Sequence, residues 1–536
     1  MEDPAFLNDT LDKRWRSICK VLLHQEVGPL SDFSAWLKEN TVELAHRKST
    51  ISGKEVTYYI REYAQDSKFA SFEEAMDTLG REPLNVNSIK DIDSLFDAVR
   101  ERAYYAGNEI LGNSSYVSRS SSVIDSFYVL ESGFVSDSKY VVHSNIVKYS
   151  EDAFGCEGIA ECKHALKVTN AGHKDNRCFE LWRGDNSSDC YYSHNMSNCQ
   201  ECMFSFNLKG GNHCIGNLRL APDKYLRLKE KLLSEIAEEL RGKKRLPTLI
   251  ELVGKSKSRL PREAEESAKN AAAERAWDSA PLDKALGRTS ELLLGQRLDA
   301  ISKYEGWMKE HIHKRYHGKS FVSSKDIAYS ELYDFGMYPV DRLVKEEEAE
   351  VLGKFPLPQR IIEEISWKSI PGAIGPIAYF TPEIRVGKNE NVKDCQTFHS
   401  SHALSVFTMV YSKYSAFSDW TRTSEHVFGS CFTHESSFCL KCFYSKKLSR
   451  CFEVDSSRNC TDCYFCHNCE NVRGGILCFN AKNLSYAICN VEVGREEFER
   501  VKKIMLDWVN RGIRQDARPP MSIFDVGAMH KRLGRA

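Results

Sequence analysis

The chain has 536 residues, more than one hydrophobic core usually organises, so we expect at least two domains. Its 42% hydrophobic and 28% charged residues are typical of a globular protein, and a net charge of −1 excludes a uniformly basic nucleic-acid binder. The sequence has no run of 18 apolar residues and begins without a basic and then apolar leader, which predicts no membrane partner and a cytoplasmic location.

Two halves of the sequence resemble each other in order along the chain. FSAWLKEN (33–40) matches YEGWMKEH (304–311), which sets Trp36 against Trp307. Further on, the motif SKY recurs after 274 residues, whereas Cys178 recurs after 273. Ordered matches of this kind predict an internal duplication with a small insertion or deletion between the copies.

The duplication predicts seven segments along the chain. They are an N-terminal extension (1–29), a first lead-in subdomain (30–114), a first cysteine-rich repeat with its closing helix (115–254), a charged helical linker (255–300), a second lead-in (301–389), a second repeat with its helix (390–527) and a basic tail (528–536). Each lead-in is expected to be small and mixed or helical.

Cysteines recur every twelve residues at Cys178, Cys190, Cys202 and Cys214. Steps of twelve backward from Cys178 reach only apolar residues: Leu166, Phe154, Val142 and Leu130. These segments are rich in Ser, Asn, Tyr and Val, and the step does not match a helix. We therefore expect an α+β, mainly β fold with two tandem cysteine-rich β-solenoid-like modules, in which compact thiols line a narrow lumen. The coil is either twelve residues or a multiple of twelve.

An amphipathic helix follows each repeat and is expected to cap it, since an open ladder end invites aggregation. The apolar face of the first consists of Tyr225, Leu228, Leu232, Ile236 and Leu240. The apolar face of the second consists of Phe498, Val501, Met505 and Trp508.

The end of the second repeat, NCTDCYFCHNCENVRGGILCFNAKNLSYAICNVEVGREEFERV, resembles the ends of cysteine-rich repeat proteins predicted in uncultivated bacterial and archaeal genomes. Those proteins end in C-x-N-L-x-x-x-x-Y-x-I-x-N and a helix. The residues that approximate the pattern are Asn480, Leu484, Tyr486, Ile488 and Asn490, with a different spacing before Leu484. The resemblance covers about a fifth of the chain and implies a solenoid-like fold without a known reaction.

Eighteen of the nineteen cysteines lie in 156–214 and 395–489, and several form C-x-x-C pairs. Thiolates in such pairs bind zinc, so a zinc site is one interpretation. Its candidate ligands are Cys460, Cys463, Cys466, Cys469 and His467 in the second repeat and Cys199, Cys202 and His194 in the first. The pairs are not kept between the copies, which favours reduced thiols in the lumen and no cofactor. Disulfides and redox use stay open.

Two basic strips follow the cap helices at matching positions. Residues 241–262 hold eight basic and one acidic residue, and residues 511–536 hold six and two. They are either solvated charge or docking strips for an anionic partner such as RNA or DNA. The binding candidates are Lys243, Lys244, Arg245, Lys255, Lys257, Arg259, Arg514, Arg518, Lys531 and Arg532.

Common catalytic motifs, including the P-loop, H-E-x-x-H and G-x-S-x-G, do not occur in the sequence. We therefore expect a non-catalytic scaffold that presents a rigid repeat surface to a protein partner or to itself. The alternative is a zinc-binding factor associated with nucleic acid or ribonucleoprotein. A second alternative is an enzyme with its site between the two copies.

Overall fold

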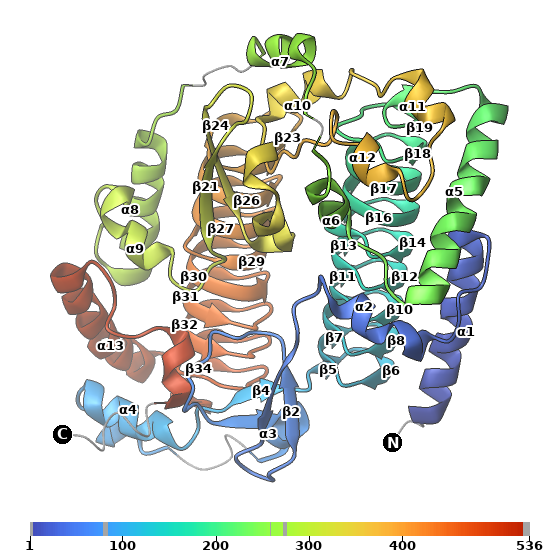
Figure 1. Cartoon of the computed structure of the whole chain (residues 1–536). Helices are drawn as coiled ribbons and strands as arrows, with labels where there is room; N and C mark the ends of the chain where they lie inside the picture. Colours follow the sequence, from blue (N-terminus) through green and yellow to red (C-terminus); the bar gives the residue numbers. More distant parts are fainter. Residues whose placement is uncertain (1–3, 79–83, 258, 272–275, 529–536) are drawn as a thin grey trace. The chain divides into compact units, whose positions relative to one another are not determined.

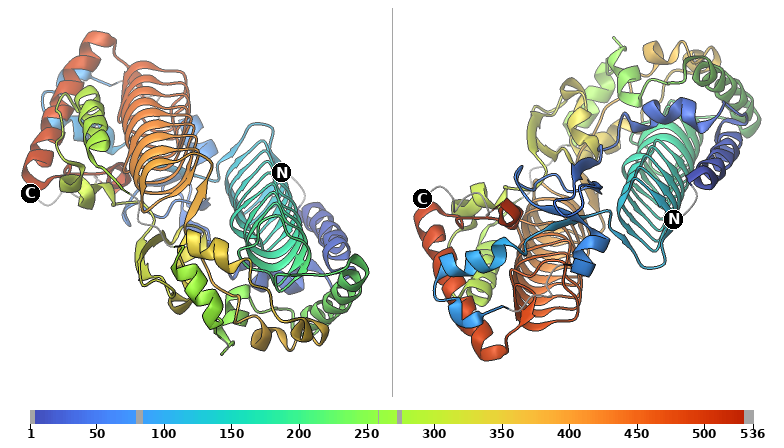
Figure 2. Two further views of the ribbon diagram at one scale, coloured as in Figure 1. Left: turned by 90° about the horizontal axis from the view of Figure 1, so that it is seen from above. Right: turned by 90° about the horizontal axis from the view of Figure 1, so that it is seen from below.

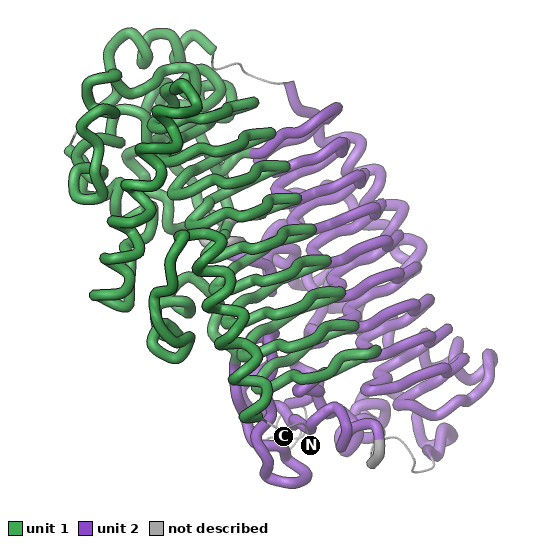
Figure 3. The backbone as a smooth tube through the Cα atoms, turned by 90° about the vertical axis from the view of Figure 1, so that its right-hand side faces the viewer, with its two compact units in different colours: residues 1–44, 109–274, 315–383 green, residues 45–108, 275–314, 384–536 purple. Residues whose placement is uncertain are grey.

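A computed structural model of the chain describes residues 4–78, 84–257, 259–271 and 276–528 (Figure 1). The fold is mixed α+β. The chain forms two compact units, each assembled from three separate stretches (Figure 3). Unit 1 comprises residues 1–44, 109–274 and 315–383, and unit 2 comprises residues 45–108, 275–314 and 384–536.

Unit 1 contains a sixteen-stranded sheet, a hairpin and eight described α-helices. The sheet strands are β5 (Ile110–Leu111), β6 (Ser115–Ser118), β7 (Ser121–Ile124), β8 (Phe127–Leu130), β9 (Gly133–Ser136), β10 (Lys139–Val142), β11 (Asn145–Lys148), β12 (Glu151–Phe154), β13 (Glu157–Ala160), β14 (Lys163–Leu166), β15 (Thr169–His173), β16 (Asn176–Asp185), β17 (Ser188–Ser197), β18 (Gln200–Met203), β19 (Asn212–Ile215) and β20 (Leu218–Arg219). The hairpin is β21 (Arg315–Lys319) and β22 (Asp326–Ser330). The helices are α1 (Pro4–Leu23), α2 (Ser34–Lys38), α5 (Pro222–Lys243), α6 (Leu249–Gly254), α7 (Arg262–Lys269), α10 (Glu346–Leu352), α11 (Gln359–Glu363) and α12 (Ile370–Ala373).

Unit 2 contains a thirteen-stranded sheet, four short strands and five described α-helices. The sheet strands are β23 (Ile384–Val386), β24 (Glu390–Lys393), β25 (Gln396–Phe398), β26 (Ser401–Val410), β27 (Lys413–Arg422), β28 (Glu425–Phe428), β29 (Cys431–His434), β30 (Ser437–Lys446), β31 (Ser449–Asp455), β32 (Thr461–His467), β33 (Arg473–Ile476), β34 (Ser485–Ile488) and β35 (Val491–Glu492). The short strands are β1 (Ala45–Lys48), β2 (Glu55–Tyr58), β3 (Phe69–Ser71) and β4 (Tyr105–Gly107). The helices are α3 (Phe72–Thr78), α4 (Ile92–Arg100), α8 (Ala280–Leu294), α9 (Glu305–Met308) and α13 (Arg495–Asp516).

In both large sheets, which we call ladders, a strand pairs in parallel with chain twelve residues further on. Val129 lies beside Val141 and Val141 beside Ala153 in unit 1, and Cys439 lies beside Cys451 in unit 2. The even-numbered strands β6 to β14 form one row and the odd-numbered β5 to β13 form another, so one turn of chain takes twelve residues. Each ladder is a stack of such turns (Figure 2).

Every third residue of a typical turn has a left-handed backbone. In one turn of unit 1 these residues are Tyr128, Glu131, Phe134 and Asp137, with φ of 56°, 44°, 57° and 51°. A non-glycine residue in this conformation costs about 1–2 kcal/mol, which the ladder hydrogen bonds and the burial of the next side chain must offset. The residue after each one is buried, as Val129 and Val135 show. Four columns of side chains therefore fill each lumen.

The predicted column behind Cys178 is wrong by one residue. Cys178 lies beside Ala165, whereas Leu166 lies beside Phe179. The turn before Cys178 holds thirteen residues, because the register shifts between the pairs Glu157–Thr169 and Ile159–Gly172. The column that contains Leu166, Phe154, Val142 and Leu130 is therefore different from the column of Cys178. The same extra residue accounts for the change in sequence offset from 274 to 273.

The last turn of each ladder reverses direction and lies beside a long helix. The final short strands β20 and β35 pair antiparallel with β19 and β34. The helix α5 contacts β19, and α13 contacts β33 and β34. The predicted apolar face of α5 is buried, as are Phe498, Val501 and Met505 of α13, whereas the ring of Trp508 lies 5.1 Å from that of Phe96. The two predicted helices are confirmed.

The unit boundaries cut across the predicted segments. Residues 45–108, predicted as part of the first lead-in, belong to unit 2, and residues 315–383 of the second lead-in belong to unit 1. Each ladder is thus completed by a segment that the sequence order assigns to the other. We call 45–108 and 315–383 the exchanged segments.

The predicted extension and the predicted helical linker each contribute a helix that packs against a ladder. The helix α1 lies in the extension and α8 in the linker, yet each contacts several strands of the ladder in its own unit. Asp12 in α1 accepts a hydrogen bond from the backbone N–H of Leu30 at 2.6 Å, and Asp283 in α8 accepts one from Ile301 at 2.8 Å. The two helices fasten the following chain in the same way.

The exchanged segments predict that the halves of the chain depend on each other. Residues 1–271 and 276–536, co-expressed as separate chains, should co-purify as a stable complex, because each unit draws strands from both fragments. Size-exclusion chromatography and circular dichroism of the mixture and of each fragment measure this. Two fragments that each fold as a monomer and do not bind one another would contradict this assignment of the exchanged segments.

Candidate functional site

The nineteen cysteines, all within the described residues, are buried and form no disulfides, and most of those in the ladders line the lumens. Their thiols donate weak hydrogen bonds to nearby carbonyls: Cys463 Sγ lies 3.5 Å from the carbonyl oxygen of Thr461. Serines on other turns do the same, as Ser144 Oγ donates to Val142 at 2.8 Å. Burial raises the pKa of Cys156 to about 12, so this thiol keeps its proton at neutral pH. The ladder thiols act as compact buried donors.

The second-repeat zinc candidates Cys460, Cys463, Cys466 and Cys469 follow left-handed residues at three-residue intervals around one turn. The pKa of Cys463 is raised by hydrogen bonds to neighbouring thiols, chiefly that of Cys451, and by burial. Among the described residues, the one group of three or more potential ligands whose atoms all lie within 4.8 Å of one another is elsewhere, at His313, Asp419 and Cys431. None of the predicted zinc ligands, including Cys199 and Cys202, belongs to that group.

This environment predicts how a lumen thiol responds to substitution. Cys463→Ser should lower the free energy of unfolding by about 1 kcal/mol, because a hydroxyl can donate to the same carbonyls. Cys463→Asp should lower it by more than about 3 kcal/mol, because it buries an unpaired charge. Urea unfolding at pH 7 compares the two. Equal losses, both reversed by added zinc, would show instead that Cys463 is a metal ligand.

The two predicted histidine ligands hold the exchanged segments. His194 Nε2 accepts from the backbone N–H of Thr381 at 3.4 Å, and His467 Nε2 accepts from that of Ala106 at 3.0 Å. Both histidines are fully buried, and burial lowers the pKa of His194 well below its ordinary value. A neutral ring whose nitrogen accepts a hydrogen bond suits anchoring of the backbone. His467 also contacts Asp455, with 2.8 Å between Nδ1 and Oδ2.

The asparagines one turn later reinforce these anchors. Asn207 Nδ2 donates to the carbonyl of Tyr379 at 2.9 Å in unit 1, and Asn480 Nδ2 donates to that of Tyr104 at 2.8 Å in unit 2. Each exchanged segment is therefore held through both its N–H and its carbonyl groups. The sequence signal was that two dipeptides recur in the second half: His194-Asn195 at His467-Asn468, and Phe206-Asn207 at Phe479-Asn480. Their structural role could not be deduced without the exchanged segments.

Sequence reasoning missed a buried Lys–Glu pair in each unit. Lys167 Nζ donates to the carbonyl of Trp36 at 2.8 Å, and Lys441 Nζ donates to that of Trp307 at 3.1 Å. One turn later, Glu180 accepts from the N–H of Leu249 at 2.9 Å, and Glu453 accepts from that of Ile523 at 2.8 Å.

Burial lowers the pKa of Lys441 to about 8 and raises the pKa of Glu453 to about 8, while each group's charge counteracts the shift of the other. The Lys–Glu pairs fasten the segments that precede each ladder and follow each cap helix. The sequence signal that could have found them is the recurrence of Lys167 at Lys441 and of Glu180 at Glu453, at the offsets of 274 and 273 that relate the two halves.

Most of the described candidates for anion binding already contact an acidic or polar side chain within their own unit. Lys243 pairs with Glu239, Lys244 with Asp32, Arg245 with Glu39 and Glu251, Arg259 with Asp341 and Arg518 with Glu310, while Arg514 donates to Gln296. Lys255 and Lys257 are exposed. Lys531 and Arg532 lie outside the described residues. The ion pairs offset much of the positive charge that a phosphate backbone would meet.

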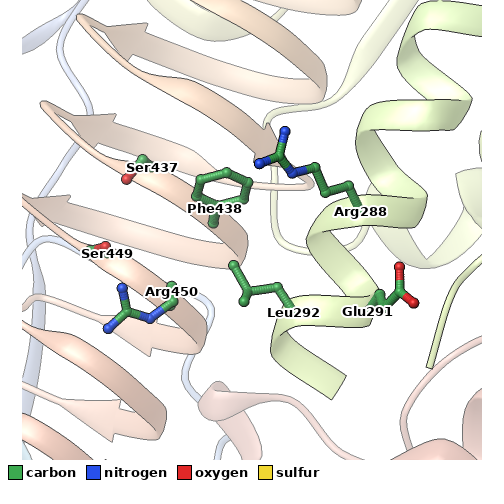
Figure 4. Close-up of a pocket in the computed structure, with 7 residues that line it drawn as sticks. All are labelled: Arg288, Glu291, Leu292, Ser437, Phe438, Ser449 and Arg450. Carbon is green, nitrogen blue, oxygen red and sulfur yellow. The ribbon is translucent and has the colours of Figure 1, made fainter. Parts of the chain in front are cut away.

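A shallow groove of about 630 Å³ lies between α8 and the ladder of unit 2. Figure 4 shows Arg288, Glu291 and Leu292 of α8 facing Phe438 and Arg450 across it. The guanidinium of Arg288 lies 5.6 Å from the centre of the Phe438 ring. Arg450 forms a two-pronged ion pair with Asp462 one turn away, at 2.6 and 2.7 Å.

Phe438 ends a column of stacked rings on successive turns. The column consists of His402, Tyr414, His426 and Phe438, with ring centres 4.9, 5.0 and 4.6 Å apart. The helix α8 covers part of it, since Thr289 Oγ1 lies 3.4 Å from His426 Nδ1. The groove is therefore an opening beside a rigid aromatic surface.

No family model, no curated protein and no solved structure matches the chain. None of the helices in the described part of the chain combines the length and apolar character needed to cross a membrane.

One lumen position of unit 1 carries a carboxyl group. Asp175 Oδ1 accepts from the N–H of Ser187 at 3.0 Å, and Oδ2 is buried with no hydrogen-bond partner among the described residues. Burial raises the pKa of Asp175 well above its ordinary value. The folded state therefore favours the protonated form, so this group supports stability fully only below the unfolded pKa of about 3.9.

Asp175→Asn should accordingly raise the free energy of unfolding at pH 7 by at least about 1 kcal/mol, because an amide has no charge to bury. The gain should shrink toward zero near pH 4. Chemical unfolding at both pH values measures it. Asp223→Asn, in the exposed first turn of α5, is the matched control and should give a smaller change of opposite sign. A destabilised Asp175→Asn at pH 7 would contradict the assignment.

Proposed function

We propose that the protein is a non-catalytic scaffold whose two ladders are tandem copies of one solenoid-like module. Matched roles at matched positions support the duplication. His194 and His467 both accept a backbone N–H from an exchanged segment, and the Lys–Glu pairs fasten equivalent segments. The offsets that pair these residues, 273 for the histidines and 274 for the lysines, are those found between the two halves of the sequence.

The observation that carries the scaffold proposal is the use of reactive groups for structure. The ladder thiols are buried donors, and the two kept histidines are buried acceptors. The buried lysines and glutamates hold backbone groups of neighbouring segments. Because these reactive groups hold the fold together, they support no reaction. The feature that a partner can recognise is then the rigid surface of evenly spaced side chains.

The groove beside α8 supports a protein segment as the partner. The guanidinium of Arg288, the methyl groups of Leu292 and the ring of Phe438 offer one cationic and two apolar contacts. A segment that presents a carboxylate next to an apolar side chain complements this set. The ion-paired basic strips lend less support to the alternative partner, a nucleic acid.

Native purification of the full chain tests the proposal against a charge-matched control. Arg288→Glu should abolish recovery of a discrete, stoichiometric protein partner, because it reverses the charge in the groove. Arg262→Glu makes the same change on the exposed α7, where Arg262 is 91% exposed, and should leave recovery unchanged. Quantitative mass spectrometry of the eluates compares the two variants.

Two outcomes would count against the scaffold proposal. Recovery of RNA or DNA that is lost on changing Lys243, Lys244 and Arg245 to Gln would establish the nucleic-acid alternative. Equal recovery of a protein by wild type and both variants would show that the groove is not the docking surface.

A further inference from the structure

Unit 2 contains a compact group of three metal-ligating side chains, His313, Asp419 and Cys431, outside the lumen and apart from the groove. The Nδ1 atom of His313 lies 3.0 Å from Asp419 Oδ2 and 3.7 Å from Cys431 Sγ, and the three ligand atoms all lie within 4.8 Å of one another. We propose that these residues bind a zinc ion, at a site different from the cysteine pairs that the sequence suggested.

The ladder register places two of the three ligands. Asp419 in β27 and Cys431 in β29 lie beside each other, one turn apart. His313 is brought to them by the chain after α9, and its backbone N–H donates to Asp419 Oδ2 at 3.0 Å. The backbone of all three ligands is thus fixed by hydrogen bonds or strand pairing, as a preorganised metal site requires.

The spacing and the donor types suit zinc. Tetrahedral zinc holds a nitrogen and an oxygen ligand roughly 3.3 Å apart, and a nitrogen and a sulfur ligand roughly 3.6 Å apart. The observed separations of 3.0 and 3.7 Å need only small side-chain adjustments to reach these values. A mixture of imidazole, thiolate and carboxylate favours zinc over magnesium or calcium, which prefer oxygen ligands alone.

Two of the three side chains are buried and the third is partly exposed. The Asp419 side chain is fully buried and Cys431 is 1% exposed, whereas the His313 side chain is 22% exposed. Three protein ligands leave a fourth position for water or for a group from a partner. Glu62 lies within electrostatic range of His313, and its Oε2 atom is buried without a hydrogen-bond partner among the described residues.

Unit 1 shows what the same framework does without these side chains. The alignment that sets Trp36 against Trp307 pairs His313 with Val42, and the offset of 274 pairs Asp419 with Asn145 and Cys431 with Glu157.

In unit 1, Asn145 Nδ2 donates to the carbonyl of Val42 at 2.8 Å and to Glu157 Oε2 at 3.0 Å. These hydrogen bonds fasten the chain to the ladder without a histidine or a thiol. The need to hold the preceding chain against the ladder therefore does not explain why unit 2 has His, Asp and Cys at these positions. Metal binding does explain it.

Equilibrium titration of the full chain with Zn²⁺, and with Co²⁺ as a spectroscopic probe, tests the proposal. Wild type, freed of metal by chelator, should bind one equivalent, and the Co²⁺ form should show a thiolate-to-metal absorption band. His313→Val should weaken Zn²⁺ binding by more than about 100-fold, since loss of a ligand exceeds the cost of losing its outer support. Affinity should also fall as the pH falls, because the thiol and the imidazole must release their protons.

Two variants separate a lost ligand from a lost fold. The triple variant His313→Val, Asp419→Asn, Cys431→Glu installs the residues of unit 1 and should fold but bind no zinc. Cys463→Ser removes a lumen thiol and should keep full binding.

Thermal unfolding with and without Zn²⁺ gives a second readout, since only a protein that binds the ion is stabilised by it. Absence of binding by wild type would overturn the proposal. Undiminished binding by the triple variant, or loss of binding only in Cys463→Ser, would overturn it as well. The scaffold proposal does not depend on the result.

Discussion

Parallel backbone pairing, at a step of twelve residues in nearly every turn, sets the arrangement of both ladders. It places equivalent side chains directly above one another, so every inward position becomes a column that must be filled uniformly. A column accepts any compact side chain that is apolar or can donate to the carbonyls beside it. This is why Ser144 and Cys156 occupy successive turns of one column, and why cysteine is common there. The repeated left-handed residues are the cost of closing so short a turn.

The exchanged segments impose a second constraint. A ladder that is closed by backbone pairing cannot present free N–H or carbonyl groups along its flanks, so another segment must be held through side chains. His194 and Asn207 do this in unit 1, and His467 and Asn480 do it in unit 2. Burial keeps the His194 ring neutral, which leaves a lone pair to accept the backbone N–H. Two of the residues predicted as ligands, His194 and His467, therefore hold backbone groups of the exchanged segments.

Under the proposed duplication, the two units share one framework and differ in chemistry. The Lys–Glu pairs and the His–Asn anchors are the same in both, since both units must fasten equivalent segments. The units differ at positions where more than one type of side chain is compatible with the fold. Asp175 occupies a lumen position at which unit 2 has Leu448, and unit 2 has His313 where unit 1 has Val42. Where ordinary hydrogen bonds already hold the chain in one unit, the aligned position of the other unit can take another role.

Features that depend on local periodicity can be predicted from consecutive residues. These are the twelve-residue step, the paired positions such as Cys178 and Cys451, and the amphipathic helices α5 and α13, because each leaves its pattern in consecutive residues. The fold established which column Cys178 joins, since one extra residue between Thr169 and Gly172 shifts every later side chain. It also decided which ladder each lead-in completes and brought His313 to Asp419, because such contacts join residues about a hundred or more positions apart and leave no periodic trace in the chain.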